Sequence, residues 1–239
     1  IDMNMKKVAI IQPNYIPWKG YFDIINSVDI FILYDDVQYT IRDWRNRNKI
    51  KTNKGSEWLT IPVILEKSYF HYLIKDVKIV DKDWGKKHWN KIKQYYSKAN
   101  YFKEYKDLFE ELYLNSKEEY LWEIDVKFIS VINNILGIKT KIILSSELNI
   151  PKSLKKTERL LEILKKINGN IYLSGPSSKN YLDENLLNEN GIAVEWMDYS
   201  GYPEYTQLFP PFIHEVSIID LIYNEGKNAP NYMKSFKRG

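Results

Sequence analysis

The sequence predicts a mixed α/β protein with a Rossmann-like, mostly parallel sheet and a helical insertion or subdomain. An apolar run at residues 7–12, a segment of helical periodicity at 18–27 and a second apolar run at 30–34 follow one another closely. A strand, a helix and a strand at this spacing form a βαβ unit, whose strands are parallel. Further apolar runs return near the C-terminus after a long helical stretch, and no repeat or linker separates the two ends. One α/β core interrupted by helices is therefore expected.

The remaining elements follow from the same periodicities. Residues 58–64 contain Pro62 and are predicted to form an edge or terminal strand. Gly137 stands where a helix C-cap belongs. The other expected elements are a short strand at 77–80, helices at 84–98, 101–113 and 120–136, a strand at 141–144, a helix at 155–167, a strand at 171–174, a helix at 182–190, a strand at 192–197 and a helix at 217–223. Residues 1–83 and 141–239 are predicted to be the two parts of the core, and residues 84–140 the helical subdomain.

Composition narrows the classes of function. Apolar residues make up 44% of the 239 residues, which is enough for a sizeable core, and aromatic residues make up 15%. Tyrosine and tryptophan join an apolar ring to a polar tip, which suits walls that bind sugars or nucleotide bases. The alternative explanation for the many tyrosines is a general bias of the composition toward Asn, Lys, Ile and Tyr. The net charge of +4 is spread along the chain, so no nucleic-acid partner is expected.

Several chemistries are excluded or disfavoured. The chain has no cysteine, so disulfides, Cys-based metal sites and thiol nucleophiles are excluded. The three histidines (His71, His88 and His214) lack metal-ligand spacing, and no metal site is predicted. No apolar run approaches the roughly 20 residues that span a bilayer. Residues 8–11 are too short for a signal-peptide core, so a cytoplasmic location is expected.

The first candidate block is QPNYIPWKGYF, at residues 12–22. It follows the first predicted strand and enters the first helix, where open α/β sheets bind ligands and helix N–H groups face anions. Its candidate binding residues for a phosphate-bearing ligand are Gln12, Tyr15, Trp18, Lys19 and Tyr21. The alternative is that Pro13, Pro17 and Gly20 only shape a turn while Trp18 covers the core.

The second block follows the second predicted strand. Asp35 and Asp36 lie at the same expected edge, where a carboxylate can orient a sugar hydroxyl, hold a metal or act as a base. Farther on, arginines alternate with asparagines, and Arg suits bidentate phosphate recognition. The candidates here are Asp36, Gln38, Arg45, Asn46, Arg47 and Asn48. Solvated charges on a loop are the alternative.

The third block is LSGPSSKNYL, at residues 173–182, after another predicted strand. Small residues and a lysine can cradle an anion, although the spacing is not that of a P-loop. Its candidates are Ser174, Gly175, Ser177, Lys179 and Tyr181. The alternative is an ordinary turn between a strand and a helix.

The fourth block combines residues 199–207 with residues 217–226. Polar and aromatic side chains here can close over a sugar, and the candidates are Tyr202, Gln207 and Asn224. Asp220 and Asn224 are four residues apart and share a helix face. The alternative is that these residues cap and pack the helix.

Together these blocks resemble the WbqC-like family of bacterial surface-polysaccharide gene clusters. The resemblance extends in family order over nearly the whole chain: residues 11–22, 36–38 with 44–48, 58–63, 172–182 and 217–226. It implies transfer of an acyl or aminoacyl group, such as glycine, to the amine of a nucleotide-linked amino sugar in O-antigen or lipopolysaccharide synthesis. Members of the family carry His-Pro where this chain has Tyr202-Pro203, so a histidine base at that position is missing here.

The acyl transfer that the resemblance implies gives roles to the candidate residues. Asp36 is predicted to be the base or orienting carboxylate, with Lys179 and Tyr202 as further catalytic residues. Phosphate is expected at Arg45, Arg47 and Lys19. The expected partners are a nucleotide-linked amino sugar and an acyl or amino-acid donor. The sequence leaves open whether ATP or an acyl carrier activates the donor, whether a metal assists, and what the oligomeric state is.

Two other functions stay open. One is a non-catalytic module that binds a nucleotide sugar or a partner enzyme of the same pathway. The other is an ATP-dependent carboxylate-adenylating enzyme, because the layout is similar to that of nucleotidyltransferases with a His-x-Gly-His turn. Both histidines of that turn and any standard ATP motif are absent from this sequence.

Overall fold

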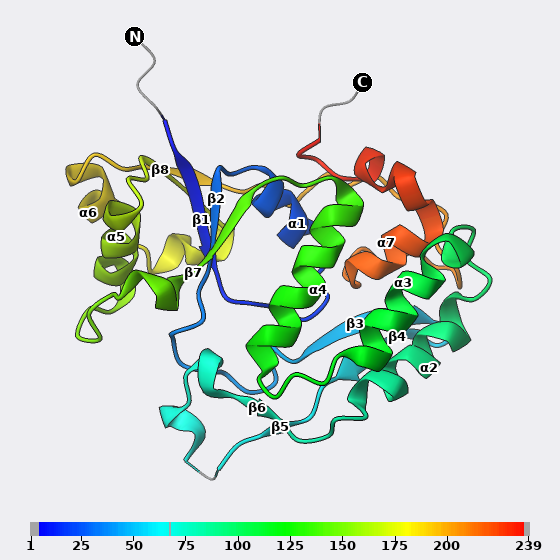
Figure 1. Cartoon of the computed structure of the whole chain (residues 1–239). Helices are drawn as coiled ribbons and strands as arrows, with labels where there is room; N and C mark the ends of the chain where they lie inside the picture. Colours follow the sequence, from blue (N-terminus) through cyan, green and yellow to red (C-terminus); the bar gives the residue numbers. More distant parts are fainter. Residues whose placement is uncertain (1–4, 67, 237–239) are drawn as a thin grey trace.

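A parallel sheet forms the centre of the protein (Figure 1). The computed structural model describes residues 5–66 and 68–236, and within these ranges five parallel strands lie in the order β7-β2-β1-β8-β9. These strands are β1 (Lys7–Ile11), β2 (Ile30–Leu33), β7 (Lys141–Leu144), β8 (Ile171–Ser174) and β9 (Ala193–Trp196). Counted along the chain, the order is 3-2-1-4-5, which is the Rossmann arrangement. The predicted fold class is confirmed.

The strands are apolar on both faces because helices cover both. Ala9, Phe31 and Leu33 point into the larger core, whereas Val8 and Ile32 point into the smaller one. The smaller core is covered by α5 (Lys156–Lys166) and α6 (Glu184–Glu189), and the larger by α1 (Lys19–Asn26), α4 (Leu121–Leu136) and α7 (Ile218–Glu225). Figure 1 shows these two groups on opposite sides of the sheet.

The segment of residues 47–66 and 68–115 packs on the side of the larger core. It contains the hairpin β3 (Arg47–Thr52) and β4 (Gly55–Thr60), the pair β5 (Val63–Ile64) and β6 (Lys78–Ile79), α2 (Trp84–Tyr96) and α3 (Phe102–Asn115). Short 3-10 helices are η1 (Tyr69–His71), η2 (Ile74–Asp76), η3 (Ser145–Leu148), η4 (Pro176–Asn180) and η5 (Gly226–Tyr232). Trp89, Phe109 and Phe128 of the helical middle belong to the same hydrophobic cluster as Phe31 of the sheet. The division into 1–83, 84–140 and 141–239 stays a prediction.

Most predicted elements are present within a few residues of the expected bounds. Gly137 ends α4 in the left-handed conformation, with φ of 75°. One expectation needs correction: residues 58–64 are not one strand. Pro62 separates β4 from β5, because proline has no N–H to donate to a ladder, and both strands lie outside the main sheet. None of the helices in the described ranges is long and apolar enough to cross a membrane.

Candidate functional site

A cavity of about 510 Å³ lies where the strand order reverses, between β1 and β8. The carboxyl ends of three strands supply its floor through Gln12 after β1, Tyr34 after β2 and Ser174 at the end of β8. The helix α5 supplies one wall and the segment from β1 to α1 another. In open α/β sheets this crevice is where ligands bind, because the loops at the strand ends diverge there.

The charge of this cavity is positive. Its described lining residues include Arg45 and Lys156, and none of them is an Asp, a Glu or a His. Arg45 is only 6% exposed. One terminal nitrogen of its guanidinium donates to the side-chain oxygen of Gln12 and the other lies 3.1 Å from an Asp43 oxygen, while its Nε has no hydrogen-bond partner in the described chain. The arrangement suits an anion, because a nearly buried guanidinium held by Gln12 and Asp43 places a fixed positive charge at the cavity.

The walls of the cavity are aromatic and carry hydroxyls. Trp18, Tyr21 and Tyr181 line it together with Tyr34, Tyr172 and Tyr199. Burial raises the pKa of Tyr34, Tyr172 and Tyr199 to about 12 in each case, so these phenols stay neutral hydrogen-bonding groups at pH 7. Tyr181 is 73% exposed and stands at the rim, where an aromatic ring is free to stack on a ligand.

The loop from Gln12 to Trp18 is held in a strained conformation. Ile16 has φ of 34°, a value that a β-branched residue rarely adopts. Beside it, Tyr15 is fully buried, and its hydroxyl lies 2.8 Å from His88 Nδ1 and 2.7 Å from the Tyr113 hydroxyl. A backbone bridge between Trp18 and Ser217 holds the other end of the loop. These contacts keep the loop in place and thereby position its polar and aromatic side chains at the cavity.

The Trp18 ring occupies the space that a side chain at residue 20 would fill, so its position requires glycine there. A Cβ at residue 20 would lie 2.3 Å from the Trp18 ring, which is far inside contact distance. The indole is also packed against the rings of Tyr199 and Tyr202, at centroid distances of 5.3 and 5.8 Å. The glycine is therefore required by the packing of a cavity wall and not only by a turn.

Eight of the residues predicted from the sequence line this cavity together. They are Gln12, Trp18, Tyr21, Arg45, Ser174, Gly175, Ser177 and Tyr181. The lining residues that sequence reasoning missed include Asn14, Tyr34, Lys156, Tyr172, Ser178 and Tyr199. Tyr34 could have been predicted, because it lies at the carboxyl end of a strand, where ligands were expected to bind. Nothing in the local sequence marks Lys156, whose φ of 52° belongs to the irregular entrance of α5.

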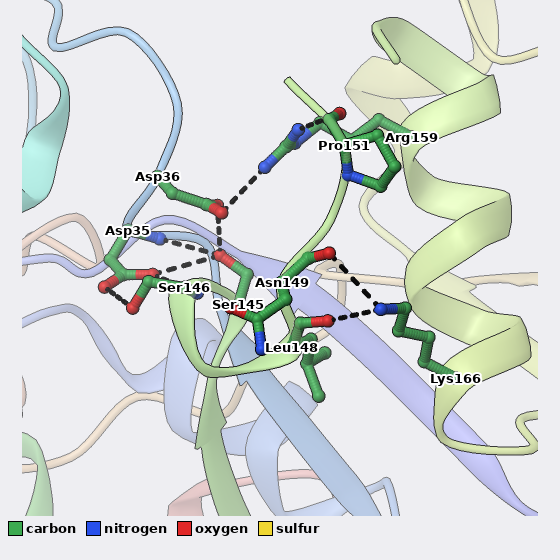
Figure 2. A network of polar contacts seen from close by, with 9 residues as sticks. All are labelled: Asp35, Asp36, Ser145, Ser146, Leu148, Asn149, Pro151, Arg159 and Lys166. Carbon is green, nitrogen blue, oxygen red and sulfur yellow. Dashed lines mark hydrogen bonds and ion pairs between the residues drawn. The ribbon is translucent and has the colours of Figure 1, made fainter. Parts of the chain in front are cut away.

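Asp36 lies outside the described lining of the cavity, in the network of Figure 2. Its two oxygens accept hydrogen bonds from the Ser145 hydroxyl at 2.5 Å and from Arg159 at 2.7 Å. Asp35 accepts from the backbone and hydroxyl of Ser146. The acidic pair thus joins the end of β2 to the end of β7 and to α5, the helix that carries Lys156 into the cavity.

Lys19 and Tyr202 lie behind Trp18, away from the cavity lining. Burial lowers the pKa of Lys19 to about 8, although the carboxylates of Glu215, Asp220 and Asp23 oppose the shift. Its Nζ lies 2.5 Å from His214 Nδ1 and 4.8 Å from the centre of the Tyr202 ring. The Tyr202 hydroxyl donates to Asp23, and burial followed by this carboxylate raises the Tyr202 pKa.

The remaining predicted residues have other positions. Asn46 and Asn48 donate to the backbone oxygens of Ile61 and Tyr15, and Arg47 stacks on Trp58 at 3.9 Å. Other candidates lie at the surface: Gln38 is exposed, and so is Lys179, whose Nζ is 5.3 Å from the centre of the Trp196 ring.

Two further candidates donate hydrogen bonds to Asp220, one to its buried carboxyl and one to its backbone oxygen. Gln207 donates to Asp220 Oδ1 at 2.9 Å, and Asn224 donates to the Asp220 backbone oxygen at 2.8 Å. Tyr96 and Tyr205 also donate to this carboxyl, whose pKa is raised by burial. Gln207 and Asn224 therefore take part in packing α7.

The fold and the cavity define the class of the protein: a Rossmann-like α/β protein with a ligand-sized cavity at the switch point of its sheet. The chain belongs to the WbqC-like protein family, whose model matches residues 12–232. It is similar to the uncharacterized protein Rv1507c of Mycobacterium tuberculosis, with 44% identity over 230 residues that cover 96% of this chain and 98% of that protein. No solved structure matches the chain.

Proposed function

We propose that this protein is a transferase that joins an acyl or aminoacyl group, such as glycine, to the amine of a nucleotide-linked amino sugar in surface-glycan synthesis. The observation that carries the proposal is the cavity at the switch point. Its cations Arg45 and Lys156 match a diphosphate, and its tyrosine walls match a base and a ribose. Membership of the WbqC-like family supports the same pathway.

The proposed reaction is an acyl transfer. The amine nitrogen attacks the carbonyl carbon of an activated donor, either a carrier thioester or an acyl adenylate. A new C–N bond forms, the C–S or C–O bond to the carrier breaks, and the leaving group takes its electron pair. The nitrogen loses one proton and the leaving group ends with one. The protein's part is to hold the diphosphate and to place the amine.

A second candidate is a non-catalytic module that binds a nucleotide sugar. It is favoured by one observation: no described residue lining the cavity at the switch point has a carboxylate or an imidazole to act as a base. The module predicts binding without turnover.

The test has two stages. Isothermal titration of UDP, dTDP and GDP should reveal binding of at least one. The protein is then incubated with the matching nucleotide amino sugar and with glycine and ATP, or with acyl carriers, and the products are followed by mass. Binding with a gain of one acyl or glycyl group supports the transferase. Binding without any product supports the module, and absence of nucleotide binding overturns both.

Replacing Gly20 with Ala is expected to weaken the binding of the nucleotide about tenfold or more. The new Cβ displaces the Trp18 ring from the cavity wall, and aromatic stacking on a base is worth about 1–3 kcal/mol. Alanine also stabilises a helix by about 1 kcal/mol relative to glycine, so weaker binding cannot come from a weaker α1. Titration calorimetry measures the affinity and thermal unfolding checks the fold. Unchanged affinity in the folded variant would show that Trp18 does not contact the ligand.

A further inference from the structure

A second, smaller cavity adjoins the first. Its volume is about 180 Å³, and it shares two lining residues, Asn14 and Trp18, with the larger cavity. Its other described lining residues are Pro17, Trp44, Asn48 and Glu215. The two cavities therefore meet at the same short segment, the strained loop that follows β1.

The chemistry of the second cavity is that of a carbohydrate site. Two indoles, Trp18 and Trp44, line it, and Trp44 is 40% exposed. The Trp44 ring lies 5.3 Å from the ring of Trp58, which the Arg47 guanidinium covers at 3.9 Å, so the exposed indole has a fixed neighbour behind it. Indole faces take the apolar C–H face of a sugar ring, while amide and carboxylate groups bind its polar edge.

The two cavities differ in charge. The larger has two cations and no acidic group among its described lining residues, whereas the smaller has the Glu215 carboxylate and no cation. Asn14 lies between them, and its Oδ1 is buried without a hydrogen-bond partner in the described chain. A ligand that matches both cavities is negative at one end and bears a hydrogen-bond donor or a positive group at the other. A nucleotide-linked amino sugar has this polarity.

We infer that the second cavity is the sugar subsite, in which Trp44 stacks on the ring and Glu215 accepts a hydrogen bond from the amine while the diphosphate lies beside Arg45. The inference rests on the proposed function and names the residues that place the reacting nitrogen. A carboxylate accepts N–H from either protonation state of the amine, so it can hold the nitrogen before and after the proton leaves.

The surroundings of Glu215 supply a matched control. Glu215 and Glu204 both act electrostatically on His214, and both are exposed, but only Glu215 lines the second cavity. Replacing Glu204 with Ala thus removes the same charge from the same neighbourhood without touching the cavity. Exposed carboxylates are also safe positions for substitution, since surface changes seldom alter stability much.

The experiment compares three probes by titration calorimetry: the free nucleoside diphosphate that the protein binds, its hexose derivative and its amino-hexose derivative. The wild type is expected to bind the amino-hexose form about tenfold more tightly than the hexose form, because a hydrogen bond between the amine and a carboxylate is stronger than one between neutral groups. Glu215→Ala is expected to abolish this preference and to leave the affinity for the free diphosphate unchanged. Glu204→Ala should keep the preference, and Trp44→Ala should weaken both sugar forms but not the free diphosphate.

The outcomes separate this inference from the proposed function. If the wild type binds no nucleotide, the proposed function fails, and the sugar subsite fails with it. If the diphosphate binds but neither sugar adds affinity, or if Glu215→Ala keeps the preference for the amine, the diphosphate site stands and the sugar subsite is overturned.

Discussion

Replacing Arg45 with Met is expected to weaken the binding of a nucleoside diphosphate by about 100-fold or more. Removing one partner of a buried, hydrogen-bonded charge pair costs about 2–5 kcal/mol, and 1.4 kcal/mol is a factor of ten in affinity. Arg45 is 6% exposed and lines the cavity, so the variant loses a positive charge that the fold holds in place there. Methionine keeps much of the length and apolar volume of the side chain.

Two further variants make the result specific. Arg45→Lys keeps the charge but loses the two-pronged geometry, so an intermediate loss of affinity is expected. Arg42→Met removes the same charge three residues away, at an exposed side chain that lines neither cavity, and should bind like the wild type. Calorimetry gives the affinities, and circular dichroism confirms the fold of each variant. Equal affinity for folded Arg45→Met and wild type would place the anion elsewhere.

Replacing Asp125 with Leu is expected to stabilise the protein by about 1–3 kcal/mol at pH 8, the penalty that a buried polar group without a hydrogen-bond partner carries. Asp125 is fully buried in α4, and neither carboxyl oxygen has a hydrogen-bond partner in the described chain. Burial raises its pKa well above the usual value, although Arg45 pulls it down. Ionising such a carboxyl in the core costs free energy, which leucine avoids.

The sign of the pH dependence follows from the raised pKa. Between the unfolded value of about 3.9 and the higher folded value, the folded state binds a proton that the unfolded state releases. The stability of the wild type relative to Asp125→Leu should therefore be greatest below the unfolded pKa and fall as the pH rises toward the folded pKa. Urea unfolding of both proteins from pH 4 to pH 8 measures this difference.

A surface variant controls for the loss of charge. Asp107 is exposed on α3, and Asp107→Leu should show no such pH-dependent gain. A pH-independent difference between Asp125→Leu and the wild type would contradict a raised pKa for Asp125. A nucleotide affinity that also changes in Asp125→Leu would indicate that this carboxyl influences Arg45, the cation that lowers its pKa.

The sequence predicted the fold class and eight of the 19 described residues that line the cavity, because both follow from local patterns. Apolar periodicity identifies strands and helices, and parallel strands bring their carboxyl ends to one edge. Gln12, Arg45 and Ser174 could therefore be expected near one another, and they line one cavity. Tyr15 comes from the same block as Gln12, yet its side chain points into the core, where it contacts His88. The chain turns at Ile16, beside Tyr15, with φ of 34°, and no periodicity predicts such a turn.

The sequence by itself determined three features: the order of strands and helices, the left-handed glycine that ends α4, and the polar blocks that follow the strands. Only the tertiary structure decided which of those polar groups are available to a ligand. Asp36 accepts hydrogen bonds from Ser145 and Arg159, which lie more than a hundred residues away along the chain. Lys156, in contrast, lies at the cavity because α5 begins there. The physical reason is that a polar side chain satisfies its hydrogen bonds with whatever the fold places beside it, and those neighbours are distant in sequence.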